Sequence, residues 1–164
     1  MKKAILSCWV LLFALSCAAQ QPLAFPFQGG RDVMRQFFKD NIEVPKNIID
    51  KKASGTVVFK FTADTTGSIK KIIIYYADDF VLTEPLIAAL KRSDRKWVIP
   101  FREKTHDFII PFRISLLPPA TANLALQKAI FDFQKNRQPI LADDQVPLDL
   151  ATLLPAITIN YKLN

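Results

Sequence analysis

The chain has little of several residue types on which catalytic and metal sites depend. Of its 164 residues, two are cysteine, one is histidine and four are glycine. Both cysteines, Cys8 and Cys17, lie near the N-terminus, so the rest of the chain can form no internal disulfide and no thiol-based catalytic site. The single histidine, His106, excludes paired-histidine metal sites. We therefore expect a domain that is stabilised by packing alone and that needs no metal and no cofactor.

Patterns typical of enzymes are missing as well. The sequence has no Gly-rich phosphate loop and no Gly-x-Ser-x-Gly pattern. The pairs Asp78-Asp79 and Asp143-Asp144 fall in polar connectors, where adjacent carboxylates diverge. We expect His106 to be a solvated residue beside a strand, since no acid–base partner is visible. The sequence favours a binding or scaffolding protein without catalytic residues, and an enzyme remains a residual hypothesis.

The charge is positive but dispersed. Lysine and arginine outnumber aspartate and glutamate by 22 to 15, a net charge of +7 that is spread along the chain. This distribution does not predict nucleic-acid binding. The densest basic cluster is Lys91, Arg92, Arg95 and Lys96 at the end of a predicted helix. It suits an anionic polymer of the cell envelope, but cations there also complement the helix dipole, and we expect the second role.

The N-terminus has the layout of a signal peptide. Lys2 and Lys3 precede an uncharged run, and small residues follow as far as Ala19. The run is shorter than the ~20 apolar residues that cross a bilayer. We therefore predict that residues 1–19 are cleaved and that the protein works in the periplasm or is exported. Residues 14–17 also resemble a degraded lipobox, so a membrane-anchored lipoprotein with lipid on Cys17 is the alternative.

The next segments alternate between helical and strand periodicity. Residues 20–30 contain two prolines and the pair Gly29-Gly30, which predict a linker. In the domain at 31–118, the apolar spacing predicts a helix, two strands, a helix and a third strand. The expected ranges are 31–41, 56–63, 69–76, 83–93 and 108–114.

Two local irregularities refine the predicted sheet. The strand period slips at Lys70-Lys71, which predicts a bulge in the second strand. Pro111 has no N–H to donate, so one side of the third strand is expected at a sheet edge. Residues 119–164 form a C-terminal extension, for which we predict a helix at 122–136, a proline-rich loop and a short strand at 156–163.

Taken in order, these motifs resemble the TonB C-terminal domain family over about residues 31–116. The resemblance rests on an opening helix, a glycine-led strand, a hairpin turn, a tryptophan near a proline, and a final strand with its own proline. The matching positions are Phe37, Phe38, Asn41, Pro45, Gly55, Phe59, Asp64, Gly67, Trp97, Pro100 and Pro111. Six of them are expected to be structural: Pro45, Gly55, Phe59, Gly67, Trp97 and Pro100.

The resemblance implies an α+β fold in which two helices pack on a three-stranded antiparallel sheet. The first strand would lie in the middle and the third at an edge. In the family, that edge captures an extended peptide of an outer-membrane receptor by strand addition. The partner-binding residues implied here are Phe108, Ile109, Ile110, Pro111, Phe112 and Arg113.

The chain departs from an energy transducer of this family. Its leader looks cleavable, and the linker at 20–30 extends at most ~3.5 Å per residue, too little to connect two membranes. We therefore expect a stand-alone binding module for an envelope protein or extended peptide, which meets a membrane only if Cys17 is lipidated. The alternative is a structural envelope protein with its sheet edge permanently covered.

The extension raises a question about that edge. The strand at 156–163 has the alternation and length needed to lie beside the third strand. One hypothesis is that it blocks the edge until a partner displaces it. The others are that it extends the fold permanently or lies on the opposite edge.

Overall fold

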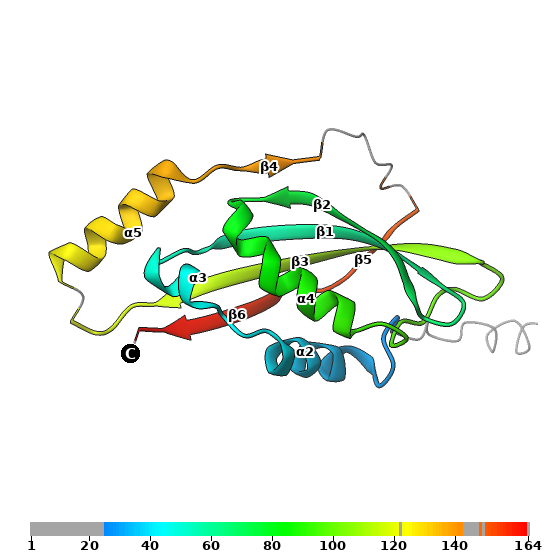
Figure 1. Cartoon of the computed structure of the whole chain (residues 1–164). Helices are drawn as coiled ribbons and strands as arrows, with labels where there is room; N and C mark the ends of the chain where they lie inside the picture. The colour runs from blue at the N-terminus through cyan, green and yellow to red at the C-terminus, as the bar shows by residue number, and fades with distance from the viewer. Residues whose placement is uncertain (1–24, 122, 143–147, 149, 164) are drawn as a thin grey trace, which may run out of the picture.

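The computed structural model describes residues 25–121, 123–142, 148 and 150–163 (Figure 1). They form an α+β fold around one mixed sheet. The helices are α2 (Gly30–Asn41), α3 (Lys46–Asp50), the 3-10 helix η2 (Phe80–Leu82), α4 (Thr83–Arg92) and α5 (Leu124–Asn136). The strands are β1 (Gly55–Asp64), β2 (Ile69–Ala77), β3 (Thr105–Leu117), β4 (Ile140–Leu141), β5 (Thr152–Leu153) and β6 (Ile157–Lys162). The predicted leader, Cys17 and part of the linker lie outside the described residues.

The centre of the sheet is antiparallel, with β1 between β2 and β3. Strand β1 buries Val57, Phe59, Phe61 and Ala63 on one face, as its alternation predicts. Phe59 stands beside Ile110, and Phe61 beside Phe108, which places the largest side chains of both strands in one row. This row is the floor of the hydrophobic core.

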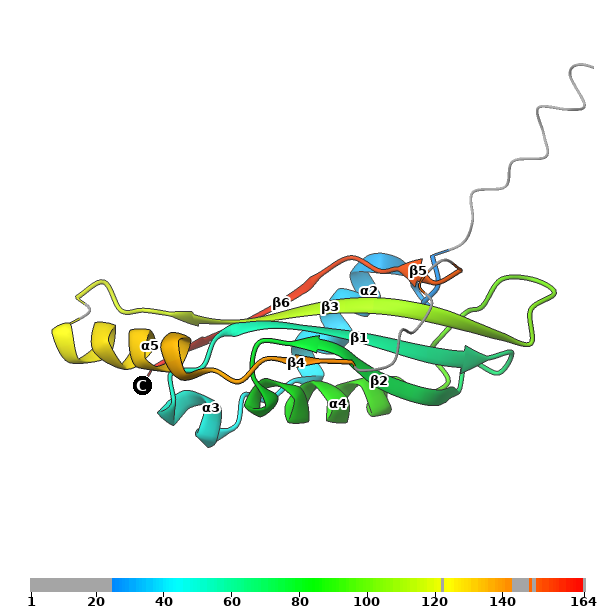
Figure 2. The same cartoon turned by 90° about the horizontal axis from the view of Figure 1, so that it is seen from above.

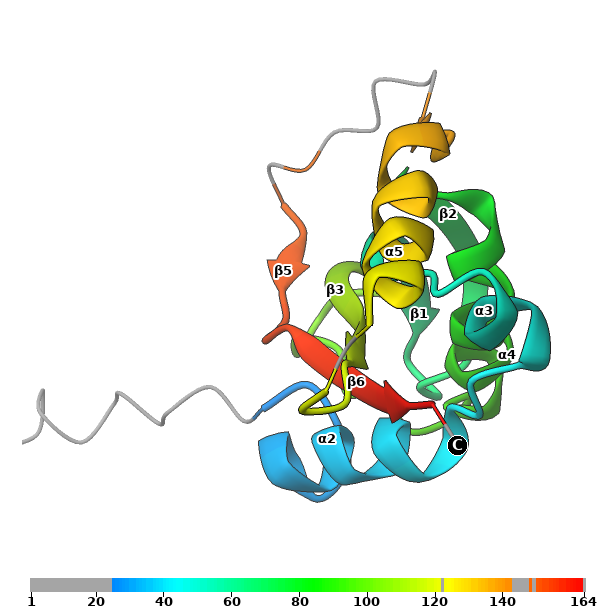
Figure 3. The same ribbon diagram turned by 90° about the vertical axis from the view of Figure 1, so that its left-hand side faces the viewer.

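Helices α2 and α4 cover that floor from the same side. Met34 and Phe38 of α2 and Leu86 and Leu90 of α4 have no exposed surface. The Phe38 ring lies 5.1 Å from the Phe112 ring in a T-shaped contact, which is favourable for aromatic pairs. Figure 3 shows both helices on one side of the curved sheet.

The sheet itself differs from the expected three strands. It has six strands in the order β4-β2-β1-β3-β5, with β6 also paired to β3. The pairing of β5 and β6 with β3 is parallel, so the sheet is mixed. The expectation that β3 is an edge strand is therefore wrong. The sequence hides this because β4 and β5 are two residues long, too short for any periodicity.

The C-terminal strand β6 is part of the core. Its alternate residues Ile157, Ile159 and Tyr161 are buried, and Leu154 before it is also buried. The Tyr161 hydroxyl donates to the Ala53 carbonyl oxygen at 2.8 Å, inside the protein. The prediction that this segment lies along the third strand is confirmed, and its burial favours a permanent extension of the fold.

Candidate functional site

The residues expected to bind a partner are already engaged. Strand β5 pairs with Phe108 and Ile109, and β6 pairs with β3 from Phe112 onward. Phe108, Ile110 and Phe112 are fully buried core residues, whereas Arg113 is exposed. The outer main-chain edge of β3 is therefore covered by the chain's own C-terminal extension over most of residues 108–113.

Pro111 lies at the interruption between the two short parallel strands. Ile110 and Pro111 lie opposite residues 154–156, the segment between β5 and β6 that is not in register with β3 in either pairing. The Leu154 N–H donates to the Ile109 carbonyl at 2.8 Å just before this interruption. Since proline offers no N–H, its presence costs the sheet no hydrogen bond at this point. Pro111 thus marks a gap in pairing rather than the end of the sheet.

His106 joins the extension to the sheet, and the expectation of a solvated histidine is wrong. Its side chain is 9% exposed. Nδ1 lies 2.6 Å from Glu103 Oε2, and Nε2 lies 2.7 Å from Thr152 Oγ1 on β5. Hydroxyl, imidazole and carboxylate also follow one another in hydrolase triads. Here Thr152 stands in a strand beside Phe108, so the contact links β3 to β5.

One open edge of the sheet is on β2. Strand β4 pairs only with Tyr76 and Ala77, and the Ala142 N–H donates to the Tyr75 carbonyl. Within the described residues, no strand pairs with the outer side of residues 69–74. Unpaired main-chain groups of this kind form a template for another extended chain.

A hollow of about 780 Å³ lies beside this open edge, between β2 and α4. We call it the β2–α4 groove. Ile69, Ile72 and Ile74 of β2 and Ile87 of α4 are its apolar lining, and all four are half-buried. Its polar lining is Lys70, Lys71, Lys91 and Asp94.

Two bulges give the groove its apolar floor. Ile72 stands opposite Phe61, and Ile69 opposite Ala63, which leaves Lys70 as the extra residue. A second shift leaves Tyr75 extra, between Ile74 opposite Phe59 and Tyr76 opposite Val58. Strict alternation would send Ile69 and Ile72 to opposite faces, so the first bulge brings both to the helix side. The bulge predicted at Lys70-Lys71 is confirmed.

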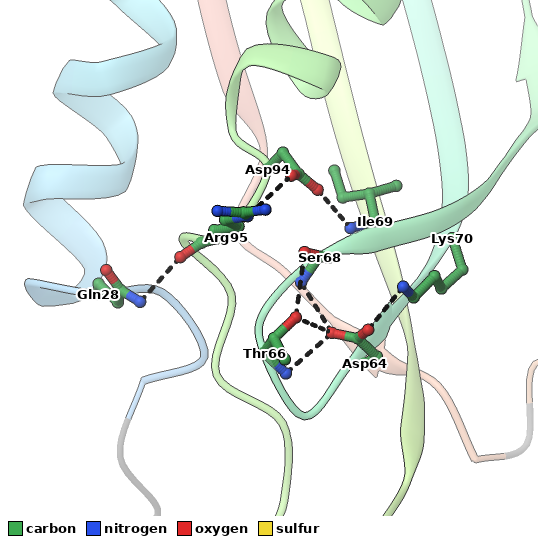
Figure 4. A network of polar contacts seen from close by, with 8 residues as sticks. All are labelled: Gln28, Asp64, Thr66, Ser68, Ile69, Lys70, Asp94 and Arg95. Carbon is green, nitrogen blue, oxygen red and sulfur yellow. Dashed lines mark hydrogen bonds and ion pairs between the residues drawn. The ribbon is translucent and has the colours of Figure 1, made fainter.

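A polar network fixes one end of the groove (Figure 4). Asp94, just beyond α4, accepts a hydrogen bond from the Ile69 N–H at 2.8 Å. The next residue, Arg95, donates its N–H to the Gly67 carbonyl at 2.9 Å, and its own carbonyl accepts from the Gln28 side chain. These bonds join the hairpin turn, the end of α4 and the N-terminal segment.

Asp64 closes the hairpin turn in the same network. Its carboxylate accepts from the Thr66 N–H and hydroxyl and from the Ser68 N–H, and it pairs with Lys70 Nζ at 2.7 Å. The Lys70 ammonium and these hydrogen bonds hold the pKa of Asp64 well below its usual range. The turn that presents Ile69 to the groove is thereby held in one conformation.

A second open edge lies on β6. Within the described residues, its outer side has no partner strand, and a hollow of about 710 Å³ separates it from α2. Its polar lining is Arg35 and Lys39 of α2 with Thr158 and Asn160, and its apolar lining is Ile42, Val44, Ala156, Ile157 and Ile159. Ile42, Ile157 and Ile159 are buried in the core, whereas the four isoleucines of the β2–α4 groove are half-buried, so this hollow exposes less apolar surface to a ligand.

Of the six residues expected to be structural, Phe59 and Trp97 lie in the core. Trp97 Nε1 donates to Ser93 Oγ at 3.0 Å. Gly67 has a φ of +76° and lies so close to Trp97 that a Cβ would stand 2.4 Å from its carbonyl oxygen. At Gly55 a Cβ would lie 2.8 Å from Asp78. Pro45 precedes α3, and Pro100 is half-buried before the loop into β3.

Within residues 25–121, 123–142, 148 and 150–163, no cluster of metal-ligating side chains is found. None of the described helices has the length and hydropathy of a membrane span.

A third hollow, of about 190 Å³, lies between the start of β1 and residues of α5 and β3. Asp78 and Arg137, which form an ion pair, are part of its lining.

Comparisons with family models, curated proteins and solved structures gave no match to this chain.

The residues of the β2–α4 groove were not predicted as a site. The sequence did contain a signal, because three isoleucines on a bulged strand share a face with the core. Their role depends on β2 being an open edge, which local periodicity cannot show.

Proposed function

We propose that this protein is a non-enzymatic binding module that takes up an extended segment of a partner protein by strand addition at the outer edge of β2. The observation that carries the proposal is that, within the described residues, no strand pairs with the outer side of residues 70–74, beside a groove lined by four isoleucines. In strand addition, main-chain hydrogen bonds supply affinity, and pockets for alternate side chains supply specificity. The β2–α4 groove offers both features.

The charge of the groove indicates the partner's chemistry. Lys70, Lys71 and Lys91 line it together with a single carboxylate, Asp94. Asp94 accepts from Ile69, and Lys70 pairs with Asp64, so Lys71 and Lys91 are the cations best placed to meet a ligand. A peptide with alternating apolar and acidic side chains would place its apolar face on the isoleucines and its acidic face toward Lys71, which stands opposite Thr62 on the other face of the sheet.

The resemblance to the TonB C-terminal domain family supports the same class of function. The order of α2, β1, β2, α4 and β3 is the order of its motifs, and β2, β1 and β3 are mutually antiparallel. The proposal moves the site away from the edge used in the family, because β5 and β6 already pair with β3. Placement in the periplasm or outside the cell follows from the predicted leader and is part of the proposal.

A synthetic peptide tests the proposal directly. The probe is an eight-residue peptide of alternating valine and glutamate with blocked ends, and binding is followed by hydrogen–deuterium exchange of β2. We expect slower exchange at the outward-facing amides of residues 70–74, because added main-chain bonds protect these groups of the open edge. A peptide of alternating valine and lysine is the charge control and should bind more weakly.

Two neighbouring isoleucines provide a matched pair of variants. Ile72 lines the groove, whereas Ile73 stands opposite Lys60 on the other face of the sheet. Ile72→Thr should weaken probe binding by about tenfold, roughly one buried side chain's apolar contribution, and Ile73→Thr should leave it unchanged. Equal effects of the two variants, or protection outside β2, would refute the assignment of this edge.

A structural envelope protein or lipoprotein is the second candidate. It is favoured by the C-terminal extension, which pairs with both β2 and β3 and so closes part of each side of the central sheet. A protein that binds no probe peptide and assembles into stable oligomers in solution would support this candidate.

A further inference from the structure

An exposed aromatic side chain marks the loop between α4 and β3. Phe101 is 91% exposed, and Val98 in the same loop is 40% exposed. This loop and the β1–β2 hairpin project from one end of the molecule, and α5 lies toward the opposite end (Figures 1 and 2). We call residues 98–104 the apical loop.

The backbone of the apical loop holds Phe101 outward. The Glu103 N–H donates to the Pro100 carbonyl at 3.2 Å, which closes a turn with Phe101 and Arg102 at its centre. Arg102 has a φ of +79°, a left-handed conformation that a non-glycine residue adopts at some cost. The Arg102 guanidinium lies 5.7 Å from the centre of the Phe101 ring. The Phe101 ring and the Arg102 guanidinium therefore project from the surface side by side.

The charges around this ring are mostly positive. Arg102 and Lys104 are exposed, and within the described part of the chain neither forms an ion pair. The loop's one carboxylate, Glu103, lies against His106. Arg95, at the end of α4, lies 3.9 Å from the Asp94 carboxylate and is not counted with these free cations. An apolar tip flanked by two cations is therefore presented to solvent.

The N-terminal segment enters the domain beside the apical loop. The Gln28 N–H donates to the Lys96 carbonyl at 2.9 Å, and the Val98 N–H donates to the Pro26 carbonyl at 3.3 Å. Phe27 also forms an isolated bridge with Trp97. Any lipid carried on Cys17 would therefore join the domain at the end that bears Phe101.

We propose that the apical loop docks on an anionic lipid surface. Phe101 and Val98 would enter the boundary between headgroups and acyl chains, and Arg102 and Lys104 would lie among the anionic headgroups. A protruding aromatic side chain needs a partner that yields around it, and a fluid bilayer interface does so without a preformed pocket. The two cations of the loop favour an anionic bilayer over a neutral one.

Vesicle flotation tests this proposal. The full chain is mixed with phosphatidylcholine vesicles with or without phosphatidylglycerol, and the bound fraction is measured. We expect binding to the anionic vesicles that exceeds binding to the neutral ones, and that falls as salt is raised. Lys2 and Lys3 of the leader also favour anionic vesicles, so the difference between the two compositions is assigned to the loop only by the variants below.

Two sets of variants distinguish binding through the apical loop from nonspecific adsorption of the protein to vesicles. Phe101→Ser combined with Arg102→Gln and Lys104→Gln should lower the anionic partition coefficient more than twentyfold, since each cation near such a surface is worth about a fivefold factor. The matched control is Phe131→Ser with Lys128→Gln and Lys135→Gln on α5, which likewise removes one phenylalanine and two cations from another exposed surface.

Three outcomes would overturn the proposal. They are equal binding of wild-type protein to both vesicle types, an apical-loop variant that binds as well as wild type, and an equal loss in the α5 control. Peptide binding to β2 is measured without vesicles, so failure here leaves the proposed strand addition untouched.

Discussion

At the scale of single residues, a cluster of aromatic side chains occupies the core. The Trp97 ring lies 4.5 Å from the Phe61 ring and 5.1 Å from the Phe27 ring. Phe59 is fully buried beside Phe112. Trp97 thus contacts Phe61 and Phe27, and Phe59 contacts Phe112. None of these residues lines the β2–α4 groove or the hollow beside β6, so we assign them to the core and not to a binding site.

Alanine substitution of either residue tests that assignment. Trp97→Ala and Phe59→Ala should each lower the free energy of unfolding by ~3 to 5 kcal/mol, because a large buried ring is lost and a cavity remains. Thermal or urea unfolding measures the effect, with the exposed Phe131→Ala as control. A stable Trp97→Ala protein that no longer binds the probe peptide would place the ring in a site.

Alanine substitution at two glycines distinguishes the cost of backbone strain from the cost of a steric clash. Gly67 and Gly30 both have a positive φ, of +76° and +89°, but a Cβ at Gly30 meets nothing within 4 Å. Gly67→Ala should cost about 3 kcal/mol or more, because strain is joined by collision with the Trp97 carbonyl. Gly30→Ala should cost only the strain, ~1 kcal/mol. Equal losses in urea unfolding would show that the close approach at Gly67 relaxes freely.

At Lys60, sequence alternation predicts the face of the sheet on which the side chain lies but not that the side chain is buried. Lys60 lies on the face away from the core row, as expected, yet it is only 6% exposed and pairs with Asp107 at 2.8 Å. Burial raises the pKa of Asp107, but hydrogen bonds from Lys60 and Thr62 outweigh this and leave the pKa below its usual value. Periodicity carries no information about such a partner on another strand.

At the scale of elements, β6 is bound to the rest of the fold through Tyr161. Its hydroxyl donates to the Ala53 carbonyl in the segment before β1. Burial raises the pKa of Tyr161 to about 12. This pKa lies above the value near 10 of an unfolded tyrosine. The folded state therefore holds the phenolic proton more tightly than the unfolded state.

The sign of the pH dependence follows from that difference. The stability contribution is fully present below pH 10 and is lost as the pH rises toward 12, because the unfolded chain ionises first. We expect wild type to lose stability relative to Tyr161→Phe over this interval. At pH 7 the variant should be less stable by ~1 kcal/mol, the net value of one hydrogen bond. A constant difference from pH 7 to pH 12, measured by urea unfolding, would contradict the buried hydroxyl.

At the scale of the whole molecule, the C-terminal extension decides which edges are available. Removing residues 119–164 would strip Leu154, Ile157, Ile159 and Tyr161 from the core and uncover the edge of β3. Each buried apolar side chain is worth ~1.5 to 3 kcal/mol, so the sum approaches the stability of a typical domain. We expect the truncated protein to unfold or aggregate, as judged by circular dichroism and size-exclusion chromatography.

The opposite result would revive the hypothesis of a displaceable tail. A truncated chain that stays folded and binds the probe peptide along residues 108–113 would show that the extension blocks a usable site. A folded chain that binds no better than the full protein would exclude self-blocking and leave β6 as a permanent strand.

The predicted leader has its own test. Intact-mass measurement of the native protein should give a chain that begins near Gln20, because small residues up to Ala19 follow a short apolar run. Retention of residues 1–19 would contradict cleavage. An acylated chain that begins at Cys17 would establish the lipoprotein instead.

The sequence alone determined the elements whose patterns are local. Alternation in β1, the slip at Lys70-Lys71 and the helical spacing in α2 and α4 predicted those elements closely, because burial of one face imposes a period on neighbouring residues. The late strand at 156–163 was also predicted, and β6 occupies its centre.

Only the tertiary structure decided which strand has an open edge. Strand pairing joins residues far apart in the sequence: Phe112 meets Ile157, and Ala77 meets Ile140. Two-residue strands such as β4 and β5 have no period to detect, and Pro111 is compatible with a sheet edge or with an interruption in pairing. The candidate site moved from β3 to β2 because long-range contacts determine which main-chain groups remain free for a partner.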